Sequence, residues 1–300
     1  MEPMKHAATS DGNKQRLILA GGLVVAGLAI LYRDVVPELI RAWGTDDNYS
    51  HGYLIPPIAA YLAWERRHKF FATPAKPSAV GLVVVLGSLL VLALGVLGIE
   101  LFLTRVSLLG ALGGTILFLF GWRRFAVVLF PLAFLLLMIP LPAIIFNQIA
   151  FPLQLIASQF GEAVVRAVNI PVLREGNVLI LANITLEVAE ACSGIRSLIS
   201  LLTLGIVFGY IGDSRNWVRV LIALSTIPVA VIANGARVAG TGIAAHHYGA
   251  VAAEGFLHEF SGWLVFIAAF AMMLLLHRIL LLLIPDRRDS PRAAIAAPAA

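Results

Sequence analysis

The sequence predicts an all-α polytopic membrane protein with about eight transmembrane helices and both termini in the cytoplasm. Of its 300 residues, 60% are hydrophobic and only 13% are charged, whereas a soluble domain carries about 25% charged residues. The apolar residues also gather in long runs, and a helix needs about 20 such residues to cross the hydrocarbon core. Lipid is therefore the expected solvent for most of the surface.

The candidate spans follow one another along nearly the whole chain. They lie at Leu17–Tyr32, His51–Trp64, Ala79–Ile99, Leu101–Trp122, Phe125–Phe146, Ile195–Ile211, Trp217–Ile243 and His258–Ile284. The second is short and begins with polar residues, and the third and fourth are joined so tightly around Glu100 that a hairpin is expected. Residues 1–16 and 285–300 are then cytoplasmic tails on either side of a membrane domain at 17–284. The first span is expected to be retained, because no signal-peptide cleavage pattern follows it.

The distribution of Lys and Arg sets the expected orientation of these spans. With the N-terminus inside, the predicted cytoplasmic segments carry Lys5, Lys14, Arg16, Arg66, Arg67, Lys69, Lys76, Arg123, Arg124, Arg215, Arg219, Arg287, Arg288 and Arg292. The predicted outer segments carry half as many, namely Arg33, Arg41, Arg105, Arg166, Arg174, Arg196 and Arg237. Basic residues of membrane proteins collect on the cytoplasmic side, so this bias favours an even number of spans. It also accounts for the net charge of +5 without nucleic-acid binding, since no basic patch has interleaved aromatic residues.

The longest outer segment, from about Asn147 to Ser193, is expected to form a small structure outside the cytoplasm. Its first part, FNQIAFPLQLIASQFGEAVVRAV, has apolar residues at helical spacing and predicts an amphipathic helix along the interface. Beyond Pro171, apolar and polar residues alternate in REGNVLILANITLEVAEACSG, which predicts a β-hairpin or strand pair. This segment leads directly to the single cysteine, Cys192.

Cys192 is the first candidate for chemistry. One cysteine allows neither an internal disulfide nor a cysteine metal cluster, and no metal or other cofactor is expected. Cys192 lies where the outer segment meets the sixth span, in EACSGIRS. A helix N-terminus and the guanidinium of Arg196, four residues on, both favour the thiolate and hence a nucleophile. A buried structural cysteine is the alternative interpretation.

Two further groups of polar residues lie at the outer ends of spans. In ANGARVAG, Asn234 and Arg237 share a helix face, which on an apolar span indicates a functional role; an Arg so near a helix end also reaches the interface by itself. In HEFSGW, His258 begins the eighth span. An interfacial histidine is the alternative there, and His246 and His247 in the preceding loop are rivals for any catalytic role.

The predicted topology places Cys192, Arg237 and His258 on one side of the membrane at similar depth. A thiol nucleophile with an imidazole base is a recurrent arrangement for acyl transfer, and a guanidinium stabilises the oxyanion that forms. The metalloprotease motif HExxH and the serine hydrolase motif GxSxG are absent from the sequence. The three residues therefore favour a membrane enzyme with a cysteine nucleophile.

Four stretches of the chain resemble, in this order, the exosortases, which are bacterial membrane transpeptidases paired with PEP-CTERM sorting signals. The stretches are DDNYSHGYLIPPIAAYLAWERR, VAEACSGIRSL, IANGARVAGTGIAAHHYG and EGFLHEFSGWLVF. They extend from Asp46 to Phe266 and so cover most of the chain. The resemblance implies an extracytoplasmic active site of a Cys, an Arg and a His, which fall on Cys192, Arg237 and His258, with His247 as a competitor for the last.

The resemblance also implies a cysteine-type protease and transpeptidase in the inner membrane of a Gram-negative bacterium, with its active site facing the periplasm. The implied substrates are secreted proteins that end in Pro-Glu-Pro, a transmembrane helix and a basic cluster. Cys192 would cleave them through a thioester, and an acceptor would resolve it; a polysaccharide and a lipid-linked molecule are both candidates. A link to exopolysaccharide and biofilm-matrix export is implied as well. Membrane lipids are the remaining expected partners.

Supporting roles stay open for several residues. Asp46, Asp47 and His51 either line the substrate entrance or form a solvated loop and helix cap. Arg196 either binds a substrate carboxylate or pairs with Glu190. The alternative functions are a transporter and a scaffold for polysaccharide assembly. A transporter should have polar residues near the membrane midplane and internal repeats, whereas the polar residues here gather at one face and no repeat is visible.

Overall fold

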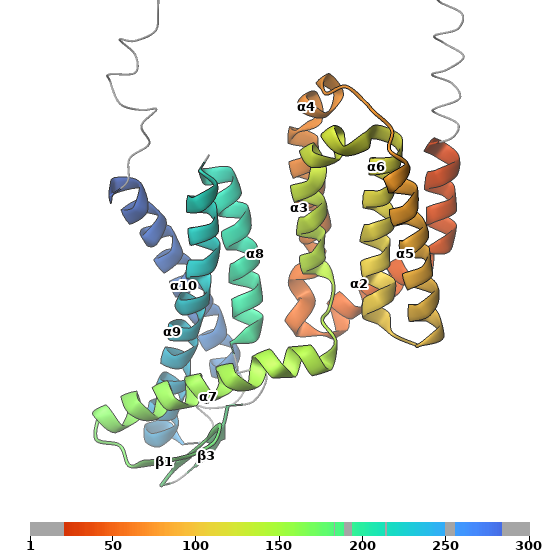
Figure 1. Ribbon diagram of the computed structural model, residues 1–300. Coiled ribbons are helices and arrows are strands. Elements are labelled where there is room, and N and C mark those ends of the chain that lie inside the picture. Colours follow the sequence, from red (N-terminus) through yellow and green to blue (C-terminus); the bar gives the residue numbers. More distant parts are fainter. Residues whose placement is uncertain (1–20, 183, 189–193, 214, 250–255, 284–300) are drawn as a thin grey trace, which may run out of the picture. The chain divides into compact units, whose positions relative to one another are not determined.

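The structure is a computed structural model that describes residues 21–182, 184–188, 194–213, 215–249 and 256–283; of residues 256–261 and 281–283 it describes only the backbone. The chain forms two compact units, Met1–Pro142 and Ala143–Ala300. Nearly all described residues are helical (Figure 1). The predicted all-α fold is therefore confirmed, and each unit is described in turn.

The first unit begins with short helices. A helix at Gly21–Leu31 is followed, after a break at residues 32–34, by α2 (Val35–Thr45). A 3₁₀ turn, η1 (Asp47–Tyr53), leads into α3 (Ile55–Glu65) and then α4 (Arg67–Ala72). At 11 residues, α3 is shorter than a membrane crossing by a straight helix requires. The second predicted span is thus realised as a shorter helix than expected, because the polar segment before it forms the separate turn η1.

The helices α5 (Ala79–Leu97) and α6 (Leu101–Phe134) form the predicted hairpin and lie side by side in Figure 1. The carboxylate of Glu100 caps α6 by accepting the backbone N–H of Leu103 at 2.8 Å. A Cβ on Gly81 would collide with the backbone of Phe118, so the two helices touch through their main chains. Glycine at this position permits the close approach.

The helix α6 contains the fourth predicted span and the first half of the fifth. Gly121, with φ 77° and ψ 178°, is not helical and breaks α6 in two. Figure 1 shows the chain turning over after this point and returning beside α3. A second 3₁₀ turn, η2 (Leu135–Met138), ends the returning segment. The reversal lies one residue before Trp122, the end of the fourth predicted span, because only glycine adopts this backbone conformation without strain.

The second unit is a bundle of α8 (Ile195–Gly212), α9 (Asn216–Tyr248) and α10 (Phe256–Leu283), preceded by α7 (Ala143–Ala167) and a small sheet. Figure 1 shows α7 lying across the direction of α8. This arrangement is the one expected of an amphipathic helix on a membrane surface that a neighbouring bundle crosses. The helix begins three residues before the predicted stretch, which starts at Phe146, and directly after Pro142.

The sheet is an antiparallel meander of β1 (Val172–Glu175), β2 (Val178–Leu181) and β3 (Thr185–Glu187), which is one strand more than the predicted pair. Gly176, at φ 63°, opens the two-residue turn between β1 and β2. One side of the sheet packs on α7 and α9. The core between them comprises Ala157, Val165, Ile170, Leu179, Leu181, Val188 and Val238. The sheet is therefore anchored just before the chain reaches Cys192.

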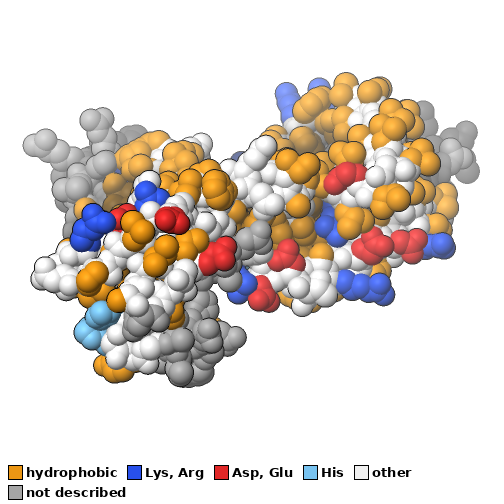
Figure 2. Space-filling model, turned by 90° about the horizontal axis from the view of Figure 1, so that it is seen from below, with side chains coloured by type: hydrophobic (Ala, Val, Ile, Leu, Met, Phe, Trp, Pro, Cys, Tyr) orange, Lys and Arg blue, Asp and Glu red, His pale blue; other side chains and the backbone are white. Residues whose placement is uncertain are grey.

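Among the described residues, six helical stretches are long and apolar enough to cross a membrane: Ala79–Leu97, Leu101–Met138, Ala143–Ala167, Ile195–Gly212, Asn216–Tyr248 and Gly262–Leu280. The second of these is the one broken at Gly121. Large hydrophobic side chains are exposed on both units, as Figure 2 shows, with Leu97 at 81% and Ile99 at 88% of their area. Helices that satisfy their own backbone and expose apolar side chains suit a lipid environment. The number of spans stays a prediction.

Candidate active site

One turn of α9, residues 234–237, contacts all three helices around it. Asn234 lies against Gly194 at the start of α8, Gly235 against Phe160 of α7, and Arg237 against Gly262 of α10. Asn234 and Arg237 are three residues apart and so lie on one helix face. The structure thus makes this turn, which the sequence singled out by its polar residues, the meeting point of the second unit.

Gly194 fixes how α8 begins. It is the residue before the first turn of α8 and has φ 76° and ψ 0°, in the left-handed region that favours glycine. A Cβ at this position would stand 2.7 Å from Cγ of Asn234, so the Asn234 side chain fills the space that a larger residue would need. Asn234 itself is buried, with 4% of its area exposed. The contact between the two holds the chain two residues after Cys192.

Arg237 connects α9 to the start of α10. A Cβ on Gly262 would lie 3.5 Å from both Cζ and Nη2 of Arg237, so the guanidinium packs directly on the backbone of α10. Arg237 is half-buried and has interaction partners. Position 258 lies one helical turn before Gly262 on the same helix face, and the structure describes only its backbone. The Arg237 guanidinium therefore lies against α10 one helical turn after position 258.

His247, the competitor of His258, lies elsewhere. It is the second-last residue of α9 and its side chain is exposed. It follows Arg237 by ten residues, which corresponds to about 15 Å along a helix. His246 beside it is half-buried, with its ring 5.1 Å from that of His247. These two rings therefore lie along α9 from Arg237, and the choice between His258 and His247 as the base stays a prediction.

Arg196 lies away from this turn. Gly194 and Leu198 face α9, and Arg196, two residues after Gly194, falls on the opposite side of α8. Its side chain is exposed, although it has an interaction partner. The structure therefore does not bring Arg196 to Arg237. Cys192 and Glu190, its predicted partners, lie outside the described residues.

The helix α7 and the sheet support the segment that leads to Cys192. Glu162 of α7 accepts hydrogen bonds from Arg166 at 2.6 Å and from Arg174 of β1 at 3.1 Å. The hydroxyl of Ser158 donates to the Gly176 carbonyl at 3.0 Å and is fully buried. The Arg166 side chain is exposed and that of Arg174 is part-buried. An exposed ion pair contributes only about 0.2–1 kcal/mol, so we expect the buried core under the sheet to contribute more to its stability than the pair with Arg166 does.

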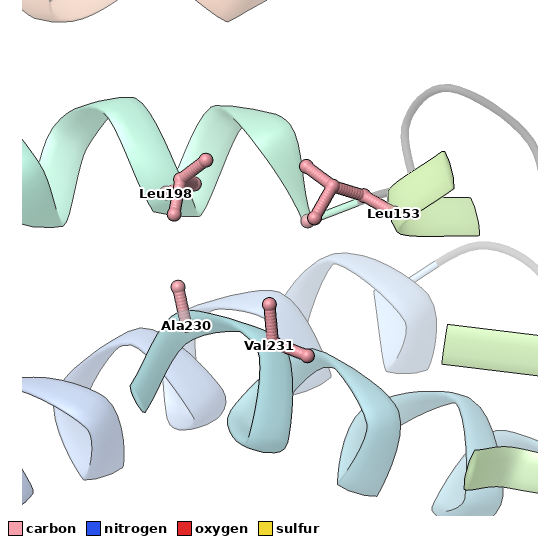
Figure 3. A pocket seen from close by; sticks show the side chains of 5 residues that line it. Leu153, Leu198, Ala230 and Val231 are labelled. Carbon is pink, nitrogen blue, oxygen red and sulfur yellow. The ribbon is translucent and has the colours of Figure 1, made fainter. Parts of the chain in front are cut away.

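A small apolar pocket adjoins Gly194. Its lining consists of Leu153 from α7, Gly194 and Leu198 from α8, and Ala230 and Val231 from α9. The hollow is shallow: its interior volume is about 10 Å³, roughly the room that one water molecule needs. In Figure 3 the side chains of Ala230 and Val231 point across it toward Leu198 and Leu153. Ala230 lies one helical turn before Asn234. The pocket therefore lies next to the turn that gathers the predicted site residues.

The acidic pair of the first outer loop lies in the first unit and begins η1. Asp46 precedes η1 and its Oδ1 accepts the backbone N–H of Asn48 at 2.9 Å. Asp47 has an interaction partner of its own. This contact makes Asp46 a helix cap. A helix cap was one of the two interpretations of this loop, and a substrate entrance was the other.

His51 and Trp43 hold the end of η2. The Nε2 of His51 lies 3.2 Å from the Leu137 carbonyl. The indole of Trp43 donates to the Met138 carbonyl at 2.8 Å. Burial lowers the pKa of the His51 imidazole, and hydrogen bonds to the backbone of Leu137 and Asn48 only partly oppose this. A neutral His51 that anchors this segment is the arrangement favoured by these contacts.

The sequence gives no sign of two residues that complete the site's surroundings. In the sequence, Gly262 is one more small residue of a predicted membrane helix, and Phe160 belongs to the amphipathic stretch. Their contacts with Arg237 and Gly235 depend on how α7, α9 and α10 cross. The stretch EGFLHEFSGWLVF does contain Gly262, but its spacing alone does not say what lies against it. Among the described residues, no three His, Cys, Asp or Glu side chains form a group that could hold a metal ion.

Comparison with known proteins gives a family. No curated protein and no solved structure matches the chain. One family model matches it, under the description "Transmembrane exosortase (Exosortase_EpsH)", over residues 43–275. The match takes in both structural units, from the segment before η1 to the middle of α10, and includes every candidate site residue. The chain, an all-α polytopic membrane protein, belongs to the transmembrane exosortase family.

Proposed function

We propose that this protein is a membrane cysteine transpeptidase that cleaves C-terminal sorting signals of the PEP-CTERM type, with Cys192 as nucleophile, Arg237 as oxyanion stabiliser and His258 as general acid and base. The observation that carries the proposal is the turn at residues 234–237, which touches both the start of α8, two residues after Cys192, and α10, one turn after His258. Membership of the exosortase family gives the reaction class.

The proposed reaction is an acyl transfer in two steps. His258 takes the proton of the Cys192 thiol, and the thiolate attacks the carbonyl carbon of the substrate peptide bond. The carbonyl oxygen becomes an oxyanion, which the Arg237 guanidinium stabilises. The C–N bond then breaks, His258 gives its proton to the leaving amine, and a thioester remains on Cys192. An acceptor amine or hydroxyl attacks the thioester and regenerates the thiol.

The proposed setting is the periplasmic face of a bacterial inner membrane. The excess of Lys and Arg in the segments at 66–76, 123–124 and 213–219 supports a cytoplasmic position for those loops. The opposite ends of the same helices, with Glu100 and the sheet at 172–187, then face the periplasm. A polysaccharide or lipid-linked acceptor, and a link to exopolysaccharide export, belong to this proposal.

The test is to co-express a PEP-CTERM substrate with variants of the full chain and to measure its processing by the shift in substrate mass. Cys192→Ser should abolish processing. Arg237→Lys should slow it about 100-fold, because an ammonium does not reproduce the planar guanidinium and one oxyanion donor is worth about that much. His258→Gln should slow it about 100-fold or more, whereas His247→Gln should leave the rate unchanged.

Equal membrane levels of all four variants are the control. Processing by Cys192→Ser at the wild-type rate would overturn the proposal. The alternative functions, a scaffold for polysaccharide assembly and a transporter, would then remain. Loss of processing in His247→Gln but not in His258→Gln would reassign the base to His247.

A further inference from the structure

Positive charge gathers at the end of the first unit where α4 and the break in α6 meet. Figure 1 shows both at the same end of the α5–α6 hairpin. The Nε of Arg124 donates to the Thr73 carbonyl at 2.8 Å, and the backbone N–H of Lys76 donates to the Phe120 carbonyl at 3.1 Å. We call residues 64–76 and 120–127 the basic face. They contain one acidic residue, Glu65, and six Lys and Arg residues: Arg66, Arg67, Lys69, Lys76, Arg123 and Arg124.

The charges of the basic face are largely left without a carboxylate. The guanidinium of Arg67 donates to the Trp64 carbonyl at 2.9 Å, as that of Arg124 does to the Thr73 carbonyl, and a carbonyl has no net charge. Three further cations have exposed side chains: Lys69, Lys76 and Arg123. In the part of the chain that the structure describes, none of these five side chains forms an ion pair. Such a one-sign surface attracts anions from outside the protein.

The position of the basic face along the hairpin places it at the level of lipid headgroups. The helix α5 has 19 residues, or about 28 Å of helix, which is close to the hydrocarbon thickness of about 30 Å. It begins at Ala79, three residues after Lys76. Three aromatic side chains of the basic face are each more than half exposed: Trp64, Phe71 and Trp122. Aromatic and basic side chains together are typical of a membrane interface, where cations meet lipid phosphates.

The aromatic rings of the basic face favour lipid over nucleic acid. Phe70 and Phe120 pack edge to face with centroids 5.3 Å apart, and the Arg124 guanidinium lies 5.2 and 5.5 Å from the two rings. The Arg67 guanidinium lies 4.3 Å from the ring centre of Trp64. Single-stranded nucleic acid requires aromatic ring faces on which its bases stack, whereas these rings are already in contact with guanidinium groups. The contacts also hold both arginines in place beside the exposed cations.

We propose that the basic face is a binding site for anionic phospholipids, with the phosphodiester headgroup among the cations and the acyl chains along α5. The first turn of α5 offers exposed apolar side chains for the chains, among them Val80 and Val83. A zwitterionic lipid brings its own positive charge to the cations and therefore compensates less of their charge. The site thus selects lipids by headgroup charge, and it does so whether or not the proposed transpeptidase activity is correct.

The experiment measures lipid binding to the purified full chain in detergent by native mass spectrometry. Phosphatidylglycerol and phosphatidylcholine with the same acyl chains are titrated separately. Wild type should bind phosphatidylglycerol at least roughly tenfold more tightly, since each Lys or Arg near an anionic lipid surface contributes about fivefold in affinity. Lys69→Gln combined with Arg123→Gln should weaken binding of phosphatidylglycerol by roughly 25-fold and leave that of phosphatidylcholine unchanged.

Arg33→Gln combined with Arg41→Gln is the matched control. It removes the same charge from two exposed side chains of the first unit outside the basic face, and Arg33 lies 3.4 Å from the Asp34 carboxylate. Its phosphatidylglycerol affinity should stay close to that of wild type. All four substituted side chains are exposed, so both double variants should unfold at the wild-type temperature in lipid-free detergent.

Three results would overturn the proposal. Equal affinity of wild type for the two lipids would remove the selection by charge. An equal loss of phosphatidylglycerol affinity in both double variants would show that net charge matters and the basic face does not. Displacement of bound phosphatidylglycerol by inorganic phosphate or a single-stranded oligonucleotide, each added at the lipid concentration, would assign the face to a soluble anion or to nucleic acid.

Discussion

At the scale of single residues, Gly194 and Asn234 determine how the nucleophile segment meets the helix bundle. Gly194 combines a left-handed backbone with the absence of room for a Cβ, and the obstacle is the buried Asn234 side chain. The two residues are complementary, since Asn234 occupies the volume that Gly194 leaves open. A substitution at either position should therefore act on Cys192 through the start of α8.

Gly194→Ala should destabilise the protein by about 3 kcal/mol, because about 1–2 kcal/mol of backbone strain is added to the cost of overpacking. Processing should fall along with stability. The measurement is thermal unfolding in detergent, together with the maleimide labelling rate of Cys192, the only cysteine of the chain.

Gly240→Ala is the control for this prediction, because nothing lies within 4 Å of a Cβ at Gly240 on the same bundle. It should be neutral or stabilising by up to about 1 kcal/mol, as expected for Ala in place of Gly within a helix. An unfolding midpoint of Gly194→Ala equal to that of wild type would contradict the proposed role of the glycine.

At the scale of secondary-structure elements, the connection between α8 and α9 is held by charge. Arg215 binds both carboxylate oxygens of Asp213, at 3.0 Å from Nε to Oδ1 and 2.7 Å from Nη2 to Oδ2. Arg219 donates to the Asp213 carbonyl at 2.6 Å. The hydrogen bonds from Arg215 hold the pKa of the Asp213 carboxyl below its ordinary value, against the opposing effect of burial. This connection is at the end of α8 opposite Gly194.

The pH dependence of stability should report this contact. Because the folded-state pKa of Asp213 is lower than that of the unfolded chain, the stabilisation is fully present above the unfolded value of 3.8 and is lost as the pH falls through the folded-state pKa. Asp213→Asn should cost about 2 kcal/mol at neutral pH, the scale of hydrogen bonds to a charged group. The difference between wild type and variant in thermal unfolding should then shrink as the pH falls below the unfolded value of 3.8.

Glu175→Gln serves as the comparison for Asp213→Asn, since Glu175 is an exposed carboxylate on β1. It should leave the unfolding curve unchanged at neutral pH. A difference between Asp213→Asn and wild type that stays constant down to pH 3 would contradict the assignment.

At the scale of the whole molecule, two segments that the Lys and Arg bias assigns to the cytoplasmic side of the membrane lie next to each other in the structure. The backbone N–H of Lys76 donates to the Phe120 carbonyl at 3.1 Å, so the loop before α5 and the break at Gly121 lie together. The turn at Ile99 and Glu100 is at the other end of the same hairpin. A membrane that the hairpin spans must therefore place residues 76 and 99 on opposite sides.

Single cysteines introduced into the Cys192→Ser background test this topology. A membrane-impermeant maleimide should label Ile99→Cys and Glu175→Cys on intact spheroplasts, because positions 99 and 175 are exposed and predicted to be periplasmic. Lys76→Cys should react only after the membrane is permeabilised. Labelling of Lys76→Cys and Ile99→Cys from the same side would rule out α5 and the first part of α6 as a spanning hairpin.

Much of this architecture was predictable because it depends on local pattern. Apolar run length gives the helices, Glu100 between two runs gives the α5–α6 hairpin, and alternation beyond Pro171 gives the strands. The position of the break in α6 was harder to predict. Gly121 is one of several glycines in α6, and its contact with the Lys76 carbonyl, which sequence does not reveal, distinguishes it from the others. The shortness of α3 likewise depends on η1, whose residues His51 and Tyr49 contact Leu137 and Leu141.

The sequence by itself determined that this is a helical membrane protein of the exosortase family and singled out the polar residues of α8 to α10, because hydrophobicity, spacing and motif order are properties of the chain alone. Only the tertiary structure decided which neighbours those residues have. It joined Asn234 to Gly194 and Arg237 to Gly262, and it set Arg196 on the far side of α8. Such contacts depend on the angles and depths at which helices cross, which are set by side-chain packing between distant segments and leave no periodic trace in the sequence.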